Sequence, residues 1–243
     1  MRAAAIIVVF VASSSHADPI GMLASSPLAE RGLALGTALT VPAGDVELSG
    51  RAAVGAAGVA DVATGLTATT ELWVEAAIGT AADHSYALGL KQVIVHRRTW
   101  QLALEGAARH LTESDSDPYD PVGTLSFGPS NGRADAFALA AIASACADGC
   151  RALFTAGVTA AVMPASSAQS AALLYAWLDA SYGGEHVRGI FELAAFPVRD
   201  GELVGVAGVR AGWRHVAFEL GLGYAGTEPS PIVLPILGVA YRP

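Results

Sequence analysis

The sequence predicts an all-β fold, a closed antiparallel transmembrane β-barrel of about 12 strands behind a cleaved signal peptide. Stretches of about ten residues alternate with period two, which is a strand pattern. Turn-forming residues separate these stretches along the chain. After the N-terminal leader, no apolar run reaches the roughly 18 residues that a membrane-spanning helix requires. These three observations favour strands over helices as the elements that meet the membrane.

The stretch Ser85–His110 shows the alternation most clearly. It reads SYALGLKQVIVH, then a basic turn, Arg97–Thr99, and then WQLALEGAARH. One face of the second half carries Trp100, Leu102, Leu104, Gly106 and Ala108. The opposite face carries Gln101, Ala103, Glu105, Ala107 and Arg109. A strand that is apolar on the outside and polar on the inside is typical of a membrane barrel.

The first 17 residues have the pattern of a secretory signal peptide. Arg2 supplies a positive charge, Ala3–Ala12 is an apolar run, and Ser15-His16-Ala17 fits a cleavage site. We expect cleavage after Ala17, which leaves one barrel domain over residues 18–243. The alternative is an N-terminal membrane anchor. The apolar run is too short for it, because a membrane-spanning helix requires about 20 apolar residues.

Composition narrows the class of protein further. The chain is 53% hydrophobic, with a mean hydropathy of +0.46, which is high for a soluble protein. Charged residues interrupt the apolar pattern throughout, so a helical membrane protein is disfavoured. The net charge of −8 comes without basic clusters, and nucleic-acid binding has no support. A soluble secreted barrel is the second fold to consider.

The first half of the chain contains five predicted strands. Val41–Gly44 is a turn by its Pro and Gly, and the Gly/Thr/Ala-rich stretch Ala60–Thr70 has no defined pattern. Tight turns or loops separate the other predicted strands. The strands are Leu33–Thr40, Asp45–Val59, Glu71–Gly79, Ser85–Val95 and Trp100–His110.

Seven further strands follow the long acidic segment Leu111–Arg133. The first two are rich in alanine and alone could be helices, but the Asp148-Gly149 turn between them favours a hairpin. Gly183-Gly184 and Asp200-Gly201 mark later turns. The strands are Ala134–Ala145, Arg151–Met163, Ala171–Tyr182, His186–Pro197, Leu203–Trp213, Val216–Tyr224 and Ile232–Tyr241.

The even count allows the first strand to pair with the last and close the barrel, which leaves no open edge in lipid. With both termini in the periplasm, the Leu111–Arg133 loop lies outside and the tight turns lie inside, as is usual. The link between the second and third strands fits this scheme poorly. Aromatic residues that share the apolar face predict two interfacial belts: Trp100, Tyr182 and Trp213 at periplasmic ends, Tyr86 and Tyr224 at outer ends.

The leader, the rhythm of strands and turns, and the hairpin GLTATTELWVEAAIG–SYALGLK resemble bacterial outer-membrane β-barrel proteins of the porin and transporter class. The resemblance implies a Gram-negative outer membrane, with lipid, lipopolysaccharide and the barrel assembly machinery as partners. The C-terminus departs from the class because it ends Tyr241-Arg242-Pro243 instead of in an aromatic residue.

Charged residues on the polar faces are candidates for the lining of the lumen. Both signs occur, so the lining does not select one sign of ion strongly. Three functions remain open: a narrow channel or transporter for small solutes, a closed structural barrel, and a barrel-embedded lipid hydrolase. The candidates are Glu47, Arg51, Glu71, Glu75, Lys91, Glu105, Arg109, Asp179, Arg188, Glu192, Arg210 and Glu219.

The sequence gives weaker indications of catalysis or metal binding. Ser85 and His110 are near each other in a hairpin but fall on opposite faces, which disfavours a hydrolase. We expect no catalytic residue, cofactor or metal ion. The acidic loop carries Glu113, Asp115, Asp117 and Asp120, which we interpret as solvated rather than as a divalent-cation site.

Three residues separate Cys146 from Cys150, whereas a redox motif has two, and no metal ligand lies nearby in the sequence. We expect them to lie opposite each other at the periplasmic rim and to form a disulfide, with two free cysteines as the alternative.

Turn lengths predict which charges meet across hairpins. A two-residue turn at Gly183-Gly184 places Asp179 opposite Arg188. A turn at Arg214-His215 places Arg210 opposite Glu219. A three-residue loop at Arg97–Thr99 places Lys91 opposite Glu105.

Overall fold

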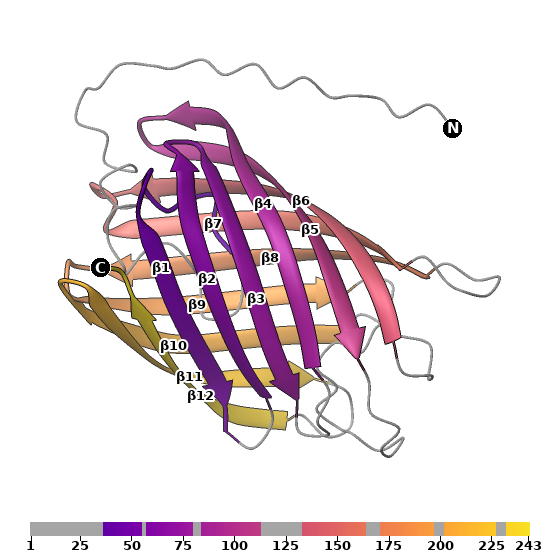
Figure 1. Ribbon diagram of the computed structural model, residues 1–243. Helices are drawn as coiled ribbons and strands as arrows, with labels where there is room; N and C mark the ends of the chain where they lie inside the picture. Colours follow the sequence, from indigo (N-terminus) through magenta and orange to yellow (C-terminus); the bar gives the residue numbers. More distant parts are fainter. Residues whose placement is uncertain are drawn as a thin grey trace.

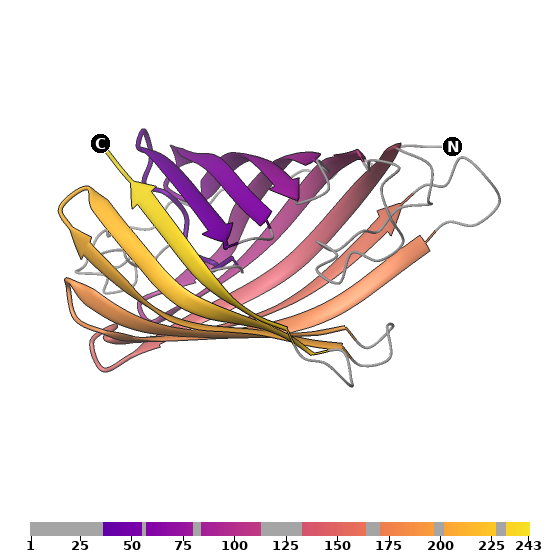
Figure 2. The same cartoon turned by 90° about the horizontal axis from the view of Figure 1, so that it is seen from below.

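The protein is a closed barrel of twelve antiparallel strands, in which each strand pairs with its neighbours in sequence and β1 pairs with β12 (Figure 1). The predicted barrel, its closure and its even strand count are therefore confirmed. The wall formed by β1–β4 faces the wall formed by β8–β12 across the lumen (Figure 2). The computed structural model describes residues 36–54, 57–79, 84–112, 133–163, 171–196, 202–226 and 232–243.

The strands of the first half are β1 Val46–Ala53, β2 Ala57–Thr67, β3 Thr70–Gly79, β4 His84–Arg97, β5 Trp100–Thr112 and β6 Arg133–Ala147. Those of the second half are β7 Ala152–Met163, β8 Ala171–Gly183, β9 Val187–Phe196, β10 Glu202–Trp213, β11 Val216–Gly226 and β12 Ile232–Tyr241. The alanine-rich β6 and β7 are strands, as predicted. Within the described ranges, no helix has the length and apolar character needed to cross a membrane.

The outer surface of the barrel is apolar. Large side chains that point outward are open to the surroundings, for example Leu139 at 71% and Phe218 at 64% exposure. The predicted belt residues Trp100, Trp213 and Tyr182 are 42%, 76% and 59% exposed. Such a surface is stable only in lipid, because water would contact a continuous apolar wall. Together with the fold, it defines a transmembrane barrel of the outer-membrane type.

The two ends of the barrel differ in the length of their connections. Even-numbered strands lead to the next strand through two to four residues, whereas the connection from β5 to β6 spans 113–132. Short connections lie on the periplasmic side of outer-membrane barrels. We call the short-turn end, where β1 begins and β12 ends, the periplasmic end, and the opposite end the outer end. The acidic loop residues Glu113, Asp115, Asp117 and Asp120 lie outside the described residues, as do the predicted signal peptide and its predicted cleavage site.

The predicted single strand Asp45–Val59 is wrong, and so is the irregular stretch Ala60–Thr70. These residues form the hairpin of β1 and β2, with Arg51 opposite Val59. Small residues such as Ala57, Gly58 and Ala60 weaken the apolar alternation that would reveal β2. The poorly fitting link between the predicted second and third strands disappears, because the real connection from β2 to β3 is the short turn at 68–69.

The predicted first strand Leu33–Thr40 is also wrong as far as the structure describes it. From Gly36 to Asp45 the chain lies inside the barrel and forms no strand, although Ala43 makes an isolated parallel bridge with Gly65 of β2. We call this segment the lumen strap. The physical reason is that β1 already pairs with both β2 and β12, so no sheet edge is available. Leu39 and Val41 are buried to 0% and 1% exposure against the inner wall.

A tight turn joins the strap to β1, as the Pro and Gly predicted. The Asp45 amide donates to the Pro42 carbonyl oxygen at 3.0 Å, and Gly44 has a φ of +84°. A positive φ at the third position of a turn is a conformation that glycine adopts without strain. The turn reverses the chain at the periplasmic mouth of the barrel.

Two tryptophans point into the lumen and lie flat against glycines of the neighbouring strand. Trp73 of β3 is the cross-strand partner of Gly89, and Trp177 of β8 is the partner of Gly157. A Cβ atom at either glycine would overlap the indole ring. The glycines therefore allow a large inward side chain to follow the wall, and both tryptophans join apolar clusters that include strap residues.

Candidate functional site: the charged lumen

All twelve predicted charges occupy inward-facing strand positions. Most are almost fully buried, and Glu75, Glu105, Arg51 and Arg109 are partly exposed. The structure adds two inward charges that the sequence reasoning missed, Asp61 and Arg242, both 4% exposed. Asp61 was missed because it falls in the stretch whose strand had no clear pattern.

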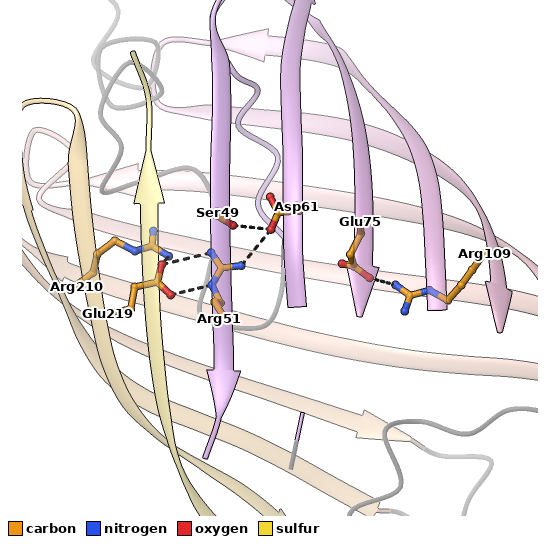
Figure 3. A network of polar contacts seen from close by, with 7 residues as sticks. All are labelled: Ser49, Arg51, Asp61, Glu75, Arg109, Arg210 and Glu219. Atoms are coloured by element: carbon orange, nitrogen blue, oxygen red, sulfur yellow. Dashed lines mark hydrogen bonds and ion pairs between the residues drawn. The ribbon is translucent and has the colours of Figure 1, made fainter. Parts of the chain in front are cut away.

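A network of three charges connects β10, β11 and β1. The Glu219 carboxylate accepts from Arg210 Nη2 at 2.6 Å and from Arg51 Nε at 2.8 Å (Figure 3). The predicted pairing of Arg210 with Glu219 is confirmed by the register of β10 and β11. Arg51 also lies 3.7 Å from Asp61, which accepts a hydrogen bond from Ser49.

The link from Glu219 to Arg51 passes over Gly238 of β12, the strand between them. Gly238 is the cross-strand partner of both residues. A Cβ atom there would overlap the Glu219 carboxylate and would lie 3.1 Å from Arg51 Cγ. A residue without a side chain at this position thus allows an ion pair to span two strands.

Two ion pairs follow the wall formed by β3, β4 and β5. Lys91 Nζ lies 3.1 Å from Glu71 Oε1, with side chains 3% and 1% exposed. Arg109 Nη2 lies 2.5 Å from Glu75 Oε1, with side chains 38% and 20% exposed. The second pair bridges β3 and β5 across Ala87 of β4, the partner of both residues.

The predicted opposition of Lys91 and Glu105 is confirmed, but the three-residue loop that was expected to produce it is wrong. The turn contains two residues, and Arg97 pairs with Trp100. A β-bulge between Val93 and Val95 inserts the extra residue instead. A three-residue loop and a bulge each shift the register by one position, so either one places Lys91 and Glu105 on the same face of the hairpin.

The register predicted for β8 and β9 is wrong. Asp179 lies opposite Glu192, and Arg188 lies opposite Gly183, because the chain turns at Glu185-His186, two residues later than predicted. The Gly184 amide donates to the Val187 carbonyl oxygen across this turn at 3.0 Å. The error is an even number of positions, so Asp179 and Arg188 still face inward, 4% and 3% exposed. Arg188 instead donates to the carbonyl oxygens of Cys150 and Arg151, at 3.4 and 3.0 Å.

The unusual C-terminus closes the barrel at its periplasmic end. Arg242 Nη2 donates to Glu47 Oε2 of β1 at 2.7 Å, and both side chains are at most 5% exposed. Burial lowers the pKa of Arg242 to about 10, so it remains charged at neutral pH. The Arg242 amide also donates to the His215 carbonyl oxygen at 2.8 Å. The residue that departs from the class pattern is therefore the partner of a lumen carboxylate.

Cys146 and Cys150 form a disulfide, as expected, with their Cα atoms 4.7 Å apart. They are not opposite each other across the hairpin, because Cys146 pairs with Leu153 and Cys150 lies in the turn. Asp148, Gly149 and Cys150 all have positive φ angles, of 51°, 62° and 67°. Leu39 of the strap packs on this turn, in a cluster with Cys150 and Leu153.

The lumen strap crosses part of the lumen at the periplasmic end. Its Val41 amide donates to Glu71 Oε2 of β3 at 2.9 Å, and its Ala38 amide donates to Ser144 Oγ of β6 at 2.9 Å. The Gly44 amide donates to the Gly65 carbonyl oxygen of β2 at 2.8 Å. These three wall residues lie within three positions of the periplasmic ends of their strands. The strap therefore narrows the periplasmic mouth.

The Ser85 and His110 side chains do not meet. Ser85 is buried at an inward position and accepts from Arg109 Nη1 at 3.4 Å. His110 is exposed, and its Nδ1 lies 2.8 Å from Asp135 Oδ1. Among the described residues, no group of three or more His, Cys, Asp or Glu side chains is arranged to hold a metal ion.

Solved structures with a similar fold include two porins. The KdgM porin superposes with a TM-score of 0.55 at 8% identity, over 81% of this chain and 98% of that chain. The NanC porin superposes with a TM-score of 0.56 at 7% identity, over the same shares of the two chains. No family model matches the sequence, and no curated protein matches it. The likeness thus lies in the fold of an outer-membrane β-barrel.

Proposed function

We propose that this chain is an outer-membrane channel for small polar solutes whose periplasmic mouth is narrowed by the lumen strap. The observation that carries the proposal is the lining, in which charges of both signs form ion pairs along the inner wall. A barrel that served only as an anchor could fill its interior with apolar side chains, as small barrels do. Solved porins share the fold, which supports the proposal.

The strap is held in a way that permits release. Its Ala38 amide donates to the neutral Ser144 hydroxyl, a bond worth about 1 kcal/mol net, and its Val41 amide donates to the Glu71 carboxylate, a bond worth about 2 kcal/mol. Its apolar contacts are those of Ala38, Leu39 and Val41, each buried in a separate cluster on the inner wall. Displacing the strap breaks no strand pairing of the closed barrel, since β1 to β12 pair without it. The lumen can thus widen while the wall stays intact.

Conductance measured in planar bilayers tests the proposal. Leu39→Asp places a charge in the apolar cluster and should expel the strap, which raises the conductance above that of the wild type. Leu39→Met retains the volume and apolar character of the side chain and should behave as the wild type does. Far-UV circular dichroism would show that both variants keep the strands.

A closed structural barrel is the second candidate. The specific observation in its favour is that the Glu71–Lys91 and Arg210–Glu219 side chains are at most 3% exposed. If neither the wild type nor Leu39→Asp conducts in the bilayer, this second function replaces the channel.

The serine and histidine that the sequence brings near each other lack the geometry of a hydrolase. A serine hydrolase needs its nucleophile within hydrogen-bond reach of a base. The Ser85 and His110 side chains point to opposite sides of the wall, so that requirement is not met by this pair. We therefore propose a non-enzymatic role.

A further inference from the structure

The ion pairs inside the barrel differ in how exposed their side chains are to a solute in the lumen. The side chains of Glu71 and Lys91 are 1% and 3% exposed. Those of Arg109 and Glu75 are 38% and 20% exposed, the highest values among the inward ion pairs of the described strands. A dissolved molecule in the lumen can therefore contact this pair directly.

The Glu75–Arg109 pair lies toward the outer end of the barrel. Arg109 is three positions before the end of β5, and Glu75 is four positions before the end of β3. The strap binds the opposite end, at Glu71 and Ser144. A solute that enters from outside therefore meets the pair before it meets the strap.

Part of the hydrogen-bonding capacity of the pair is unused. A guanidinium carries five N–H donors, and Arg109 donates to Glu75 Oε1 and to Ser85 Oγ within the described residues. Glu75 receives its hydrogen bond at Oε1, which leaves Oε2 as an acceptor. Figure 3 shows the Glu75 and Arg109 side chains pointing toward each other. Ala87 of β4, the cross-strand partner of both residues, has only a methyl side chain. A carboxylate and a guanidinium are thus presented side by side.

Tyr175 of β8 adds a hydroxyl and an aromatic ring from another part of the wall. It hydrogen-bonds to Thr159, its cross-strand partner, and lies within electrostatic range of Glu75, Glu105 and Arg109. Glu105 belongs to the same hydrogen-bonded row, which continues through Ala140 to Thr159. Because this row meets β5 four residues from Arg109, Glu105 and Tyr175 flank the ion pair, and the site itself consists of the Glu75 carboxylate and the Arg109 guanidinium.

We infer that these side chains bind a small zwitterion with one carboxylate and one ammonium group, such as an amino acid; this rests on the proposed channel, because it names the class of its solute. A simple anion on the remaining N–H groups of Arg109 adds a second negative charge beside Glu75. A simple cation on Glu75 Oε2 adds a second positive charge beside Arg109. A zwitterion adds one charge of each sign, with its carboxylate on Arg109 and its ammonium on Glu75, so every charge at the site has a partner of opposite sign.

Calorimetric titration of the purified full-length protein in detergent tests the site. The probes are serine, the anion lactate, the cation ethanolammonium and the neutral solute glycerol, which are similar in size. Serine should bind with a Kd on the order of 1 mM, and the other three at least tenfold more weakly. Arg109→Gln and Glu75→Gln should each weaken serine binding at least tenfold. Arg151→Gln, which removes an arginine from the exposed periplasmic turn, is the matched control and should bind as the wild type does.

A charge swap guards against loss of fold as an explanation. The double variant Glu75→Arg with Arg109→Glu keeps an ion pair at the same place and should bind serine again. Serine binding that is unchanged in both single variants, or equal binding of all four probes, would overturn the inference.

Osmotic swelling of proteoliposomes in the same solutes separates this inference from the proposed function. Serine binding without any solute-dependent swelling supports the site and refutes the channel. Swelling at equal rates in all four solutes, without serine binding, supports the channel and refutes the site.

Discussion

Gly238 occupies the position where a single methyl group should disturb the lumen most. In Gly238→Ala the new Cβ atom overlaps the Glu219 carboxylate and lies 3.0 Å from its Cδ. Glu219 must then move away from Arg210 and Arg51, which it contacts at 2.6 and 2.8 Å. Because these charges are buried, disrupting the network should lower the free energy of unfolding by about 3 kcal/mol.

Urea unfolding in detergent, followed by tryptophan fluorescence, measures this loss. Gly50→Ala is the matched control, since the nearest atom to its Cβ outside its chain neighbours is the Val59 carbonyl oxygen at 3.9 Å. The control should change stability by less than about 0.5 kcal/mol. In a Glu219→Ala background the overlap is gone, so adding Gly238→Ala should cost less than about 0.5 kcal/mol. Equal stability of Gly238→Ala and Gly50→Ala, or an equal loss in both backgrounds, would refute the reasoning.

Three further substitutions test other contacts by the same unfolding measurement. Gly157→Ala should cost about 2 kcal/mol because its Cβ overlaps the Trp177 indole, whereas Gly106→Ala, 3.5 Å from Leu139 Cδ2, should be nearly neutral; similar losses in the two would argue against the packing role. Arg242→Ala leaves Glu47 buried without its partner and should cost about 3 kcal/mol, and Arg242→Lys should retain part of that stability; a neutral Arg242→Ala would contradict closure by this pair. The double variant Cys146→Ser with Cys150→Ser opens a loop of about five residues and should lower the free energy of unfolding by about 2 kcal/mol. Unfolding of this variant and of the oxidised wild type at the same urea concentration would contradict that expectation.

The sequence by itself determined the inward face for the twelve predicted charges. Alternation with period two assigns the faces of a strand whether or not its partner is known. The twelve predicted charges therefore occupy inward positions even where the register was wrong. Asp179 illustrates this, since its partner is Glu192 instead of Arg188 but the error is an even number of positions.

Hairpin registers were predictable only where the turn was tight and free of irregularities. Arg210 and Glu219 meet because the Arg214-His215 turn contains two residues, as read from the sequence. A bulge near Ile94 and a turn at Glu185-His186, two residues later than predicted, set the register in the other two hairpins. Neither has a distinct residue signal, because a bulge depends on how the whole sheet twists and closes.

Only the tertiary structure decided what happens to Gly36–Asp45. Its residues Ala38, Leu39 and Val41 would suit a strand, but closure of β1 onto β12 leaves no edge for it to join. Its apolar side chains are instead buried inside the barrel, where the amides bind Glu71 and Ser144. The contact of Arg51 with Glu219 is of the same kind, since these residues are 168 positions apart and meet only because the barrel closes over Gly238. Local pattern fixes the face of each side chain, whereas long-range closure fixes which side chains share the interior.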